Sequence, residues 1–144
     1  MCIRDRCDPK EWIPNPDEFN REITDSQWKA QVYRCMRRIP TLEEPSRKRG
    51  VVDLYDVSDD WLPIYDSTRI KGYYMAIGSS GNQFKNAPIA GHCMAELIEA
   101  CEKGQNHDED PVQVKTVYTG LTLNMGFYSR NREINPNSSF SVNG

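Results

Sequence analysis

The sequence predicts an α/β protein, in which strands of a mixed sheet and helices lie between irregular termini. Two observations predict the helices, because apolar residues recur at helical spacing over residues 24–40 and again over residues 87–101. A third observation predicts the sheet: the continuous apolar run 73–78 ends at a glycine and is typical of a buried central strand. The middle of the chain is therefore expected to form a strand–turn–helix unit.

The first helix is expected over residues 24–40. Thr24 and Asp25 are its N-cap candidates, and Pro40 ends it. The basic residues of its polar face gather near the C-terminal end, where the helix dipole favours positive charge. We interpret this basic face as a solvated surface rather than as an anion site.

The other elements follow from local composition. Residues 51–57 are rich in β-branched side chains that partly alternate, and they predict a strand. Residues 61–66 and 112–120 predict two more. The second helix, 87–101, has Gly104 as its stop signal. Its apolar face is predicted to pack in the core and consists of Ile89, Cys93, Met94, Leu97, Ile98 and Cys101.

We divide the chain into four segments. Residues 1–20 are an irregular arm whose first six residues, 1–6, resemble a translated sequencing adaptor. Residues 21–49 hold a helix and a linker, residues 50–104 the strand–turn–helix unit, and residues 105–144 a C-terminal extension. The end of that extension is rich in Asn and Ser and has no pattern of its own. We therefore expect it to need another surface in order to be ordered.

Composition excludes several classes of function. A net charge of −3 gives no reason to expect nucleic acid or an anionic membrane as a partner. No apolar run approaches the roughly 18 residues of a membrane span, and the first residues lack the apolar core of a signal peptide. Five cysteines without close spacing favour a reducing, cytoplasmic location. The sequence makes no prediction of oligomeric state.

The turn between the central strand and the second helix is GSSGNQFKNAP, residues 78–88, and it fails three named templates. A P-loop needs glycine before its lysine, but Phe84 precedes Lys85. A dinucleotide fingerprint needs a third glycine. A nucleophile elbow built on Ser80 would need glycine where Asn82 stands.

The same turn nevertheless has the features of an anion-stabilising arrangement. Gly78 and Gly81 let a ligand approach the backbone, Asn86 can cap the helix, and Pro88 fits its first turn. The positive end of the helix dipole and the charge of Lys85 then favour an anion in the turn. A plain strand–helix connection with a capping asparagine explains the pattern equally well, so both interpretations stay open.

Two other groups of residues offer metal ligands, and neither predicts a metal site. One matches no zinc-finger or zinc-ribbon spacing and comprises His92, Cys93, Cys101 and His107. The other is acidic and comprises Asp53, Asp56, Asp59, Asp60 and Asp66. We interpret most of these carboxylates as solvated turn residues and caps. No metal is expected.

One stretch of the sequence carries a family resemblance. GVVDLYDVSDDWLPIYD is followed by KGYYMAIGSSGNQFKNAPIAGHCMAELI, within residues 50–101. The pattern is Tyr-x-x-x-x-Asp, a Pro-Ile turn, a Gly-x-Tyr strand, and G-x-S-G-x-x-F-K-x-A-P leading into a helix; the preceding helix ending in RRIP also fits. It resembles the C-terminal part of FAD-dependent amine oxidoreductases of the D-amino-acid-oxidase-like superfamily, in particular the sarcosine oxidase and dimethylglycine or sarcosine dehydrogenase branch.

The resemblance implies FAD as the cofactor and a small amine or amino acid as the substrate. It implies oxidation of the C–N bond of a small amino acid or N-methylated amine, with hydride transfer to flavin N5. The turn would lie against the flavin ring, and the helix dipole and a lysine would stabilise the negative charge that reduction places at N1 and the C2 carbonyl. The cofactor-binding residues carried over are Gly78, Ser80, Gly81, Asn82 and Lys85.

The resemblance also implies two catalytic residues and shows some departures. Lys85 would attract the substrate carboxylate, and Tyr55 matches a tyrosine on the substrate side of the ring. Gln83 stands where many members have glycine. Asp53 stands where some sarcosine oxidases carry the cysteine that bonds FAD, so non-covalent FAD is expected.

The 144 residues lack the dinucleotide-binding G-x-G-x-x-G motif. We therefore expect an incomplete C-terminal piece of an FAD-binding oxidoreductase, in which residues 21–49 belong to the substrate side and residues 50–104 to the FAD-dependent domain. Such a piece is expected neither to hold FAD nor to turn over alone. The alternative is a small non-enzymatic anion-binding module that uses a helix N-terminus.

Overall fold

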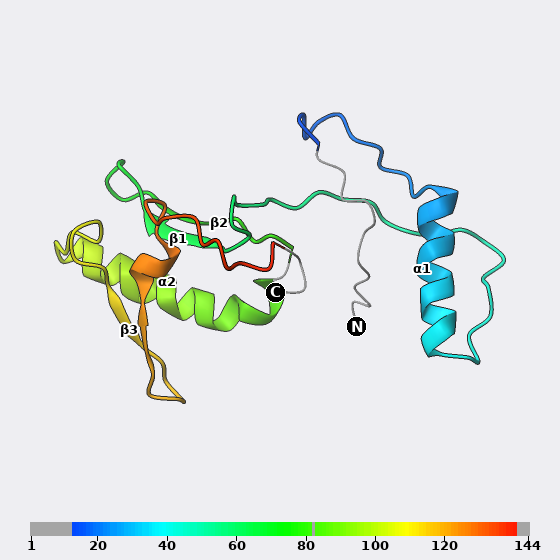
Figure 1. The fold of residues 1–144 in the computed structure, drawn as a ribbon. Coiled ribbons are helices and arrows are strands. Elements are labelled where there is room, and N and C mark those ends of the chain that lie inside the picture. The colour runs from blue at the N-terminus through cyan, green and yellow to red at the C-terminus, as the bar shows by residue number, and fades with distance from the viewer. Residues whose placement is uncertain (1–12, 82, 141–144) are drawn as a thin grey trace. The chain divides into compact units, whose positions relative to one another are not determined.

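The computed structural model describes residues 13–81 and 83–140. The chain divides into two compact units, Met1–Leu54 and Tyr55–Gly144. Within the described residues it contains two α-helices and two small antiparallel sheets of two strands each (Figure 1). This mixed composition is compatible with the predicted α/β class. The adaptor-like residues 1–6 lie outside the described ranges.

The first unit contains helix α1, Asp25–Arg38. Thr24 is its N-cap: the Thr24 side chain accepts a hydrogen bond from the amide of Gln27, and the Gln27 side chain accepts one from the amide of Thr24. This reciprocal capping box satisfies two amides that have no partner inside the helix. Arg37 and Arg38 lie in the last turn, where they complement the dipole. The predicted helix is confirmed.

The strand predicted over residues 51–57 is wrong. These residues form no strand, and Val51 is 90 % exposed. The Asp53 side chain accepts a hydrogen bond from the amide of Leu54, a local contact typical of turns. A high β propensity stabilises a strand only where a neighbouring strand offers a hydrogen-bonding ladder, and this segment has none.

The second unit begins with a hairpin. Strand β1, Ile64–Ser67, pairs antiparallel with strand β2, Tyr74–Ile77, in a register that sets Tyr65 opposite Ala76. The strand expected within 61–66 is therefore present, shifted toward the C-terminus. The strand expected within 73–78 is also present, but it is neither central nor buried. It belongs to a two-stranded sheet, and Ala76 and Ile77 are exposed.

Helix α2, Ala87–Glu102, follows the short 3₁₀-helix η1, Gln83–Asn86, and runs beside β1 (Figure 1). Gly104 follows the helix with a φ of 99°, as its predicted stop signal. The predicted apolar face is buried in part. Cys93 and Leu97 are in the core, whereas Ile89 and Ile98 remain exposed. No helix among the described residues has the length and apolar character needed to cross a membrane.

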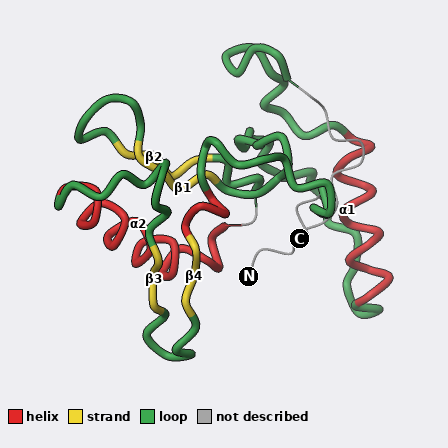
Figure 2. The backbone as a smooth tube through the Cα atoms, turned by 60° about the vertical axis from the view of Figure 1, so that its left-hand side comes forward, coloured by secondary structure: helices red, strands yellow, loops and turns green. Residues whose placement is uncertain are grey.

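The second sheet completes the core of this unit. Strand β3, Gln113–Lys115, pairs antiparallel with β4, Thr122–Asn124, and the 3₁₀-helix η2, Met125–Tyr128, follows (Figure 2). The connection between the two strands extends away from α2 in both views. The buried apolar side chains of the unit form one cluster, which consists of Tyr65, Cys93, Leu97, Val112, Val114 and Met125.

Two neighbouring residues of α2 test where this core lies. Leu97 is 0 % exposed and Ile98 is 37 % exposed. Leu97→Ala removes a fully packed side chain and leaves a cavity, so the free energy of unfolding should fall by about 2–5 kcal/mol. Ile98→Ala, the matched control, should lower it by only about 1 kcal/mol. Urea unfolding of both variants measures the difference, and equal losses would contradict this placement of the core.

Candidate functional site

The turn after β2 is held by a carboxylate from earlier in the chain. The amide of Gly78 donates a hydrogen bond to Asp56 Oδ2. Asp56 Oδ1 accepts hydrogen bonds from the amide of Ser79 at 3.1 Å and from its hydroxyl at 2.7 Å. The amide of Ser80 donates to the main-chain oxygen of Asp56 at 2.9 Å. Three successive amides of the turn therefore contact this one residue of the chain itself.

Asp56 is exposed, as expected for a solvated turn residue or cap, and its carboxylate binds the amides of the turn. Burial raises the pKa of its carboxyl, but the hydrogen bonds from Ser79 and Gly78 outweigh burial and hold the pKa below its usual value. The group is consequently ionised at neutral pH. A carboxylate of the protein itself therefore accepts the hydrogen bonds of the first amides of the turn.

The backbone of the turn is left-handed at three positions. The φ angles are 68° at Gly78, 47° at Ser80 and 74° at Gly81. A Cβ atom at Gly78 would also lie 3.2 Å from the Cβ atom of Ser58, so glycine is needed there for packing as well as for its φ angle. Ser80 is fully buried, and its hydroxyl donates to the main-chain oxygen of Gly78 at 3.2 Å. Gly78 and Ser80 therefore form the interior of the turn.

The remaining residues predicted for the site lie at or beside this turn. Lys85 is exposed in η1, next to Phe84, whose side chain is 97 % exposed. Tyr55 immediately precedes Asp56, so the contacts of Asp56 bring it next to the turn. The exposed Tyr55 ring packs edge-on against Trp61, with 6.3 Å between ring centroids. Asn82 lies outside the described residues.

The start of α2 differs in detail from the expected cap. Asn86 occupies the N-cap position but makes no capping hydrogen bond with its side chain. Its Nδ2 atom instead donates to Gln83 Oε1 at 3.0 Å, and the Tyr65 hydroxyl donates to the same oxygen at 3.2 Å. Gln83 therefore ties η1 to β1. Pro88 lies in the first turn of α2, as predicted.

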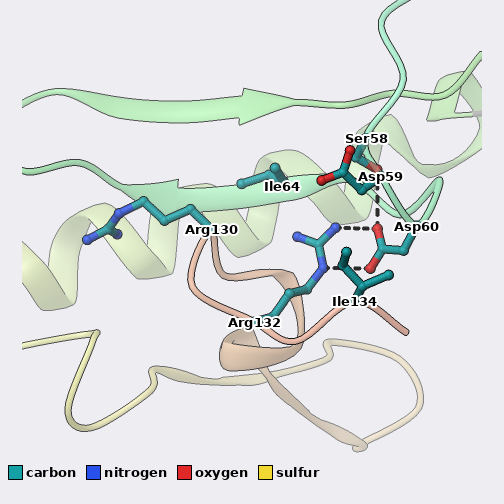
Figure 3. A pocket seen from close by; sticks show the side chains of 7 residues that line it. All are labelled: Ser58, Asp59, Asp60, Ile64, Arg130, Arg132 and Ile134. Atoms are coloured by element: carbon teal, nitrogen blue, oxygen red, sulfur yellow. Dashed lines mark hydrogen bonds and ion pairs between the residues drawn. The ribbon is translucent and has the colours of Figure 1, made fainter. Parts of the chain in front are cut away.

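A second polar cluster contains the ion pair of Asp60 with Arg132. The Asp60 carboxylate is 1 % exposed and accepts from Arg132 Nη2 at 2.6 Å and from Arg132 Nε at 3.0 Å. Figure 3 shows Arg132 pointing at Asp60, whereas Arg130 extends away from it. A pocket of about 180 Å³ adjoins the pair and is lined by Ser58, Asp59, Asp60, Ile64, Arg130, Arg132 and Ile134.

A second buried carboxylate, Asp66 on β1, also binds the C-terminal extension. Asp66 is 0 % exposed, and its Oδ2 atom accepts from the amide of Arg130 at 2.7 Å and from the Ser129 hydroxyl at 3.0 Å. The Arg130 guanidinium lies 2.9 Å from the same oxygen and 2.6 Å from Asp108 Oδ2. The extension therefore packs against its own unit, and the expectation that its end needs a separate surface is wrong for residues 131–135, which contact Asp60 and Asp108.

Buried His107 lies beside this pair. Its Nδ1 atom accepts a hydrogen bond from the amide of Val112 at 3.1 Å, so the proton of the neutral ring is on Nε2. The Nε2 atom is 3.7 Å from Asp66 Oδ1 and has no hydrogen-bond partner among the described residues. The ring thus joins the loop before β3 to the carboxylate on β1.

Sequence reasoning missed the roles of Asp56, Asp60 and Asp66. For buried Asp60 and Asp66 the available signal was the tail motif Arg-x-Arg at residues 130–132, because a buried carboxylate requires a partner that is charged or donates hydrogen bonds. Nothing local identified which aspartates are buried.

The candidate zinc ligands do not assemble into a site. In the part of the chain that the structure describes, no group of three or more His, Cys, Asp or Glu residues is placed to hold a metal ion. His92 Nε2 is instead 3.2 Å from the main-chain oxygen of Lys115, and Cys93 is buried in the core.

The turn and its surroundings define a strand–turn–helix site with an internal carboxylate, an exposed lysine and an exposed aromatic ring. Such a surface has the chemistry to cover a planar apolar group and to place a positive charge near an anionic edge. No known protein family, curated protein or solved structure matches the chain.

Acid should weaken the Asp60–Arg132 pair. Burial raises the pKa of Asp60, but hydrogen bonds from Arg132 and from the amide of Leu62 lower it from 3.8 to about 2. Because the folded pKa is below the unfolded one, about 2 kcal/mol of stability is present above pH ~4 and is lost as the pH falls through about 2. Urea unfolding between pH 7 and pH 2 measures this loss, which Asp60→Asn should reduce.

Removing Arg132, the partner of Asp60, at neutral pH should lower the free energy of unfolding more than acid does. Arg132→Ala leaves a buried, unpaired carboxylate, so the free energy of unfolding should fall by about 3–5 kcal/mol. The matched control is Arg69→Ala, because Arg69 is an exposed arginine in the β1–β2 connection. Similar stabilities of the two variants would contradict the role given to the pair.

Proposed function

We propose that this chain forms part of the flavin site of an FAD-dependent oxidoreductase that oxidises the C–N bond of a small amino acid or N-methylated amine. The observation that carries the proposal is the preformed turn between β2 and η1, with exposed Phe84 and Lys85 directly after it. This arrangement supports the assignment that the sequence resemblance implies.

The exposed residues around the turn fit an isoalloxazine ring. Ile77 and Phe84 are exposed side chains close to the turn in sequence, and exposed Tyr55 precedes Asp56, which contacts the turn. An apolar ring system would cover such surface favourably. Lys85 supplies the positive charge that a reduced flavin requires near its pyrimidine edge. FAD itself would supply the hydride acceptor.

The burial of Gly78 and Ser80 refines their proposed roles. Both would act on the cofactor through the shape of the turn, whereas Gly81, Asn82 and Lys85 would be the residues that hold it. Tyr55 would lie on the substrate side, and Lys85 would also attract a substrate carboxylate. The proposal includes a cytoplasmic location, non-covalent FAD, and a dinucleotide-binding motif outside these 144 residues.

One observation favours the alternative of an anion-binding module, and another argues against it. The tail that argued against an independent fold is ordered within its own unit, which favours a self-contained module. However, the amides of residues 78–80 already contact Asp56, so an external anion would have only the start of α2 and Lys85. We therefore prefer the flavin site.

The proposal predicts what lies upstream in the gene. In-frame extension of the coding sequence should add G-x-G-x-x-G between a strand and a helix, and the extended protein should purify with stoichiometric FAD absorbing near about 450 nm. The 144-residue chain should purify without it. An extended protein that binds no flavin would contradict the proposed function. Stoichiometric FAD on the 144 residues would contradict the proposal that they form only part of the flavin site.

A lysine pair tests the site in the extended protein. Lys85→Ala should lower kcat/KM for amine oxidation by about 100-fold, because it removes the positive charge that stabilises the reduced flavin. Lys71→Ala, which alters an exposed lysine in the β1–β2 connection, should leave it unchanged. Equal activities would argue against a role for Lys85.

A further inference from the structure

We propose that Asp56 is a positioning residue: its carboxylate is an internal anion that holds residues 78–80 in their left-handed turn. The role of Asp56 in holding the turn is argued from the contacts alone. Its consequence for the cofactor rests on the function proposed above.

The contacts define a small anion site that the protein forms with its own exposed side chain. Asp56 Oδ2 accepts a hydrogen bond from the amide of Gly78, and Asp56 Oδ1 accepts one from the amide of Ser79. Oδ1 also accepts a hydrogen bond from the Ser79 hydroxyl at 2.7 Å. A hydrogen bond from the Ser80 amide to the main chain of Asp56 closes the arrangement. These partners are more than 20 residues away in sequence, so the turn depends on a long-range contact.

The energetic reason for the anion is the strained backbone. Ser80 has a φ of 47°, which is unfavourable for a residue with a side chain. Hydrogen bonds from amides to a charged carboxylate are stronger than those between neutral groups, and they offset that cost. The carboxylate therefore selects the left-handed turn over extended conformations.

The same carboxylate sets the charge next to the turn. Its negative charge opposes the positive charge of Lys85 and the dipole of the following helix. In a flavin site this would disfavour the additional negative charge of reduction. Asp56 would thus tune the midpoint potential downward, in opposition to Lys85.

The internal anion is tested by amide hydrogen exchange, measured by NMR on the 144-residue protein. Asp56→Ala should speed exchange at residues 78–80 by at least about tenfold, while the core amide of Met125 keeps its protection. Millimolar formate or acetate should restore protection, because either ion can occupy the vacated position, and chloride should not. Asp59→Asn, at an exposed aspartate nearby, is the matched control and should change nothing.

A conservative variant keeps the test decisive if Asp56→Ala unfolds the second unit. Asp56→Asn offers only one acceptor oxygen, so either the Gly78 or the Ser79 amide should lose protection while the other retains it. Unchanged exchange in this variant would overturn the proposal. Equal restoration by chloride in the alanine variant would also overturn it, because it would reflect ionic strength alone.

The consequence for the cofactor is tested separately on the extended, FAD-loaded protein. Asp56→Asn should raise the flavin midpoint potential, and Asp59→Asn should leave it unchanged. If exchange responds but the extended protein binds no FAD, the proposed function fails and the internal anion stands. If FAD binds and the potential does not move, the tuning role fails and the function stands.

Discussion

The second unit depends on two carboxylates that are buried with their charge. Asp60 and Asp66 are almost inaccessible to solvent, and such groups are tolerated only when hydrogen bonds and opposite charges replace the lost water. Both find their partners in the C-terminal extension, where Arg132 and Arg130 are two residues apart. The extension is therefore part of the fold, and a segment without regular structure binds the hairpin of β1 and β2 through these two arginines.

The features that the sequence predicted well are those with local causes. The capping box of α1 lies within four residues, and the apolar period of α2 marks the side chains that face the core. The strand expected over 51–57 failed because a strand needs a partner, and propensity contains no information about partners. The ordered tail was missed for the same reason, since its contacts lie more than 60 residues away.

The candidate site shows the same limit. Its position between β2 and α2, and the preference of its backbone for negative charge, were predictable from small residues, a lysine and the start of a helix. The occupant of the turn was not, because Asp56 lies in a stretch that was interpreted as a strand followed by solvated aspartates. An anion-binding pattern in a sequence therefore identifies a shape, while the source of the anion depends on the tertiary structure.

The long separation of the ion pairs has a consequence for synthesis on the ribosome. Asp60 is translated 72 residues before Arg132, with which it shares its hydrogen bonds. Until Arg130 and Arg132 leave the exit tunnel, neither carboxylate has its charged partner. The helix α2 has every local signal it needs before that moment, so the nascent chain would hold a formed helix beside an open hairpin. Folding of this unit is accordingly completed only after Arg132 has been synthesised.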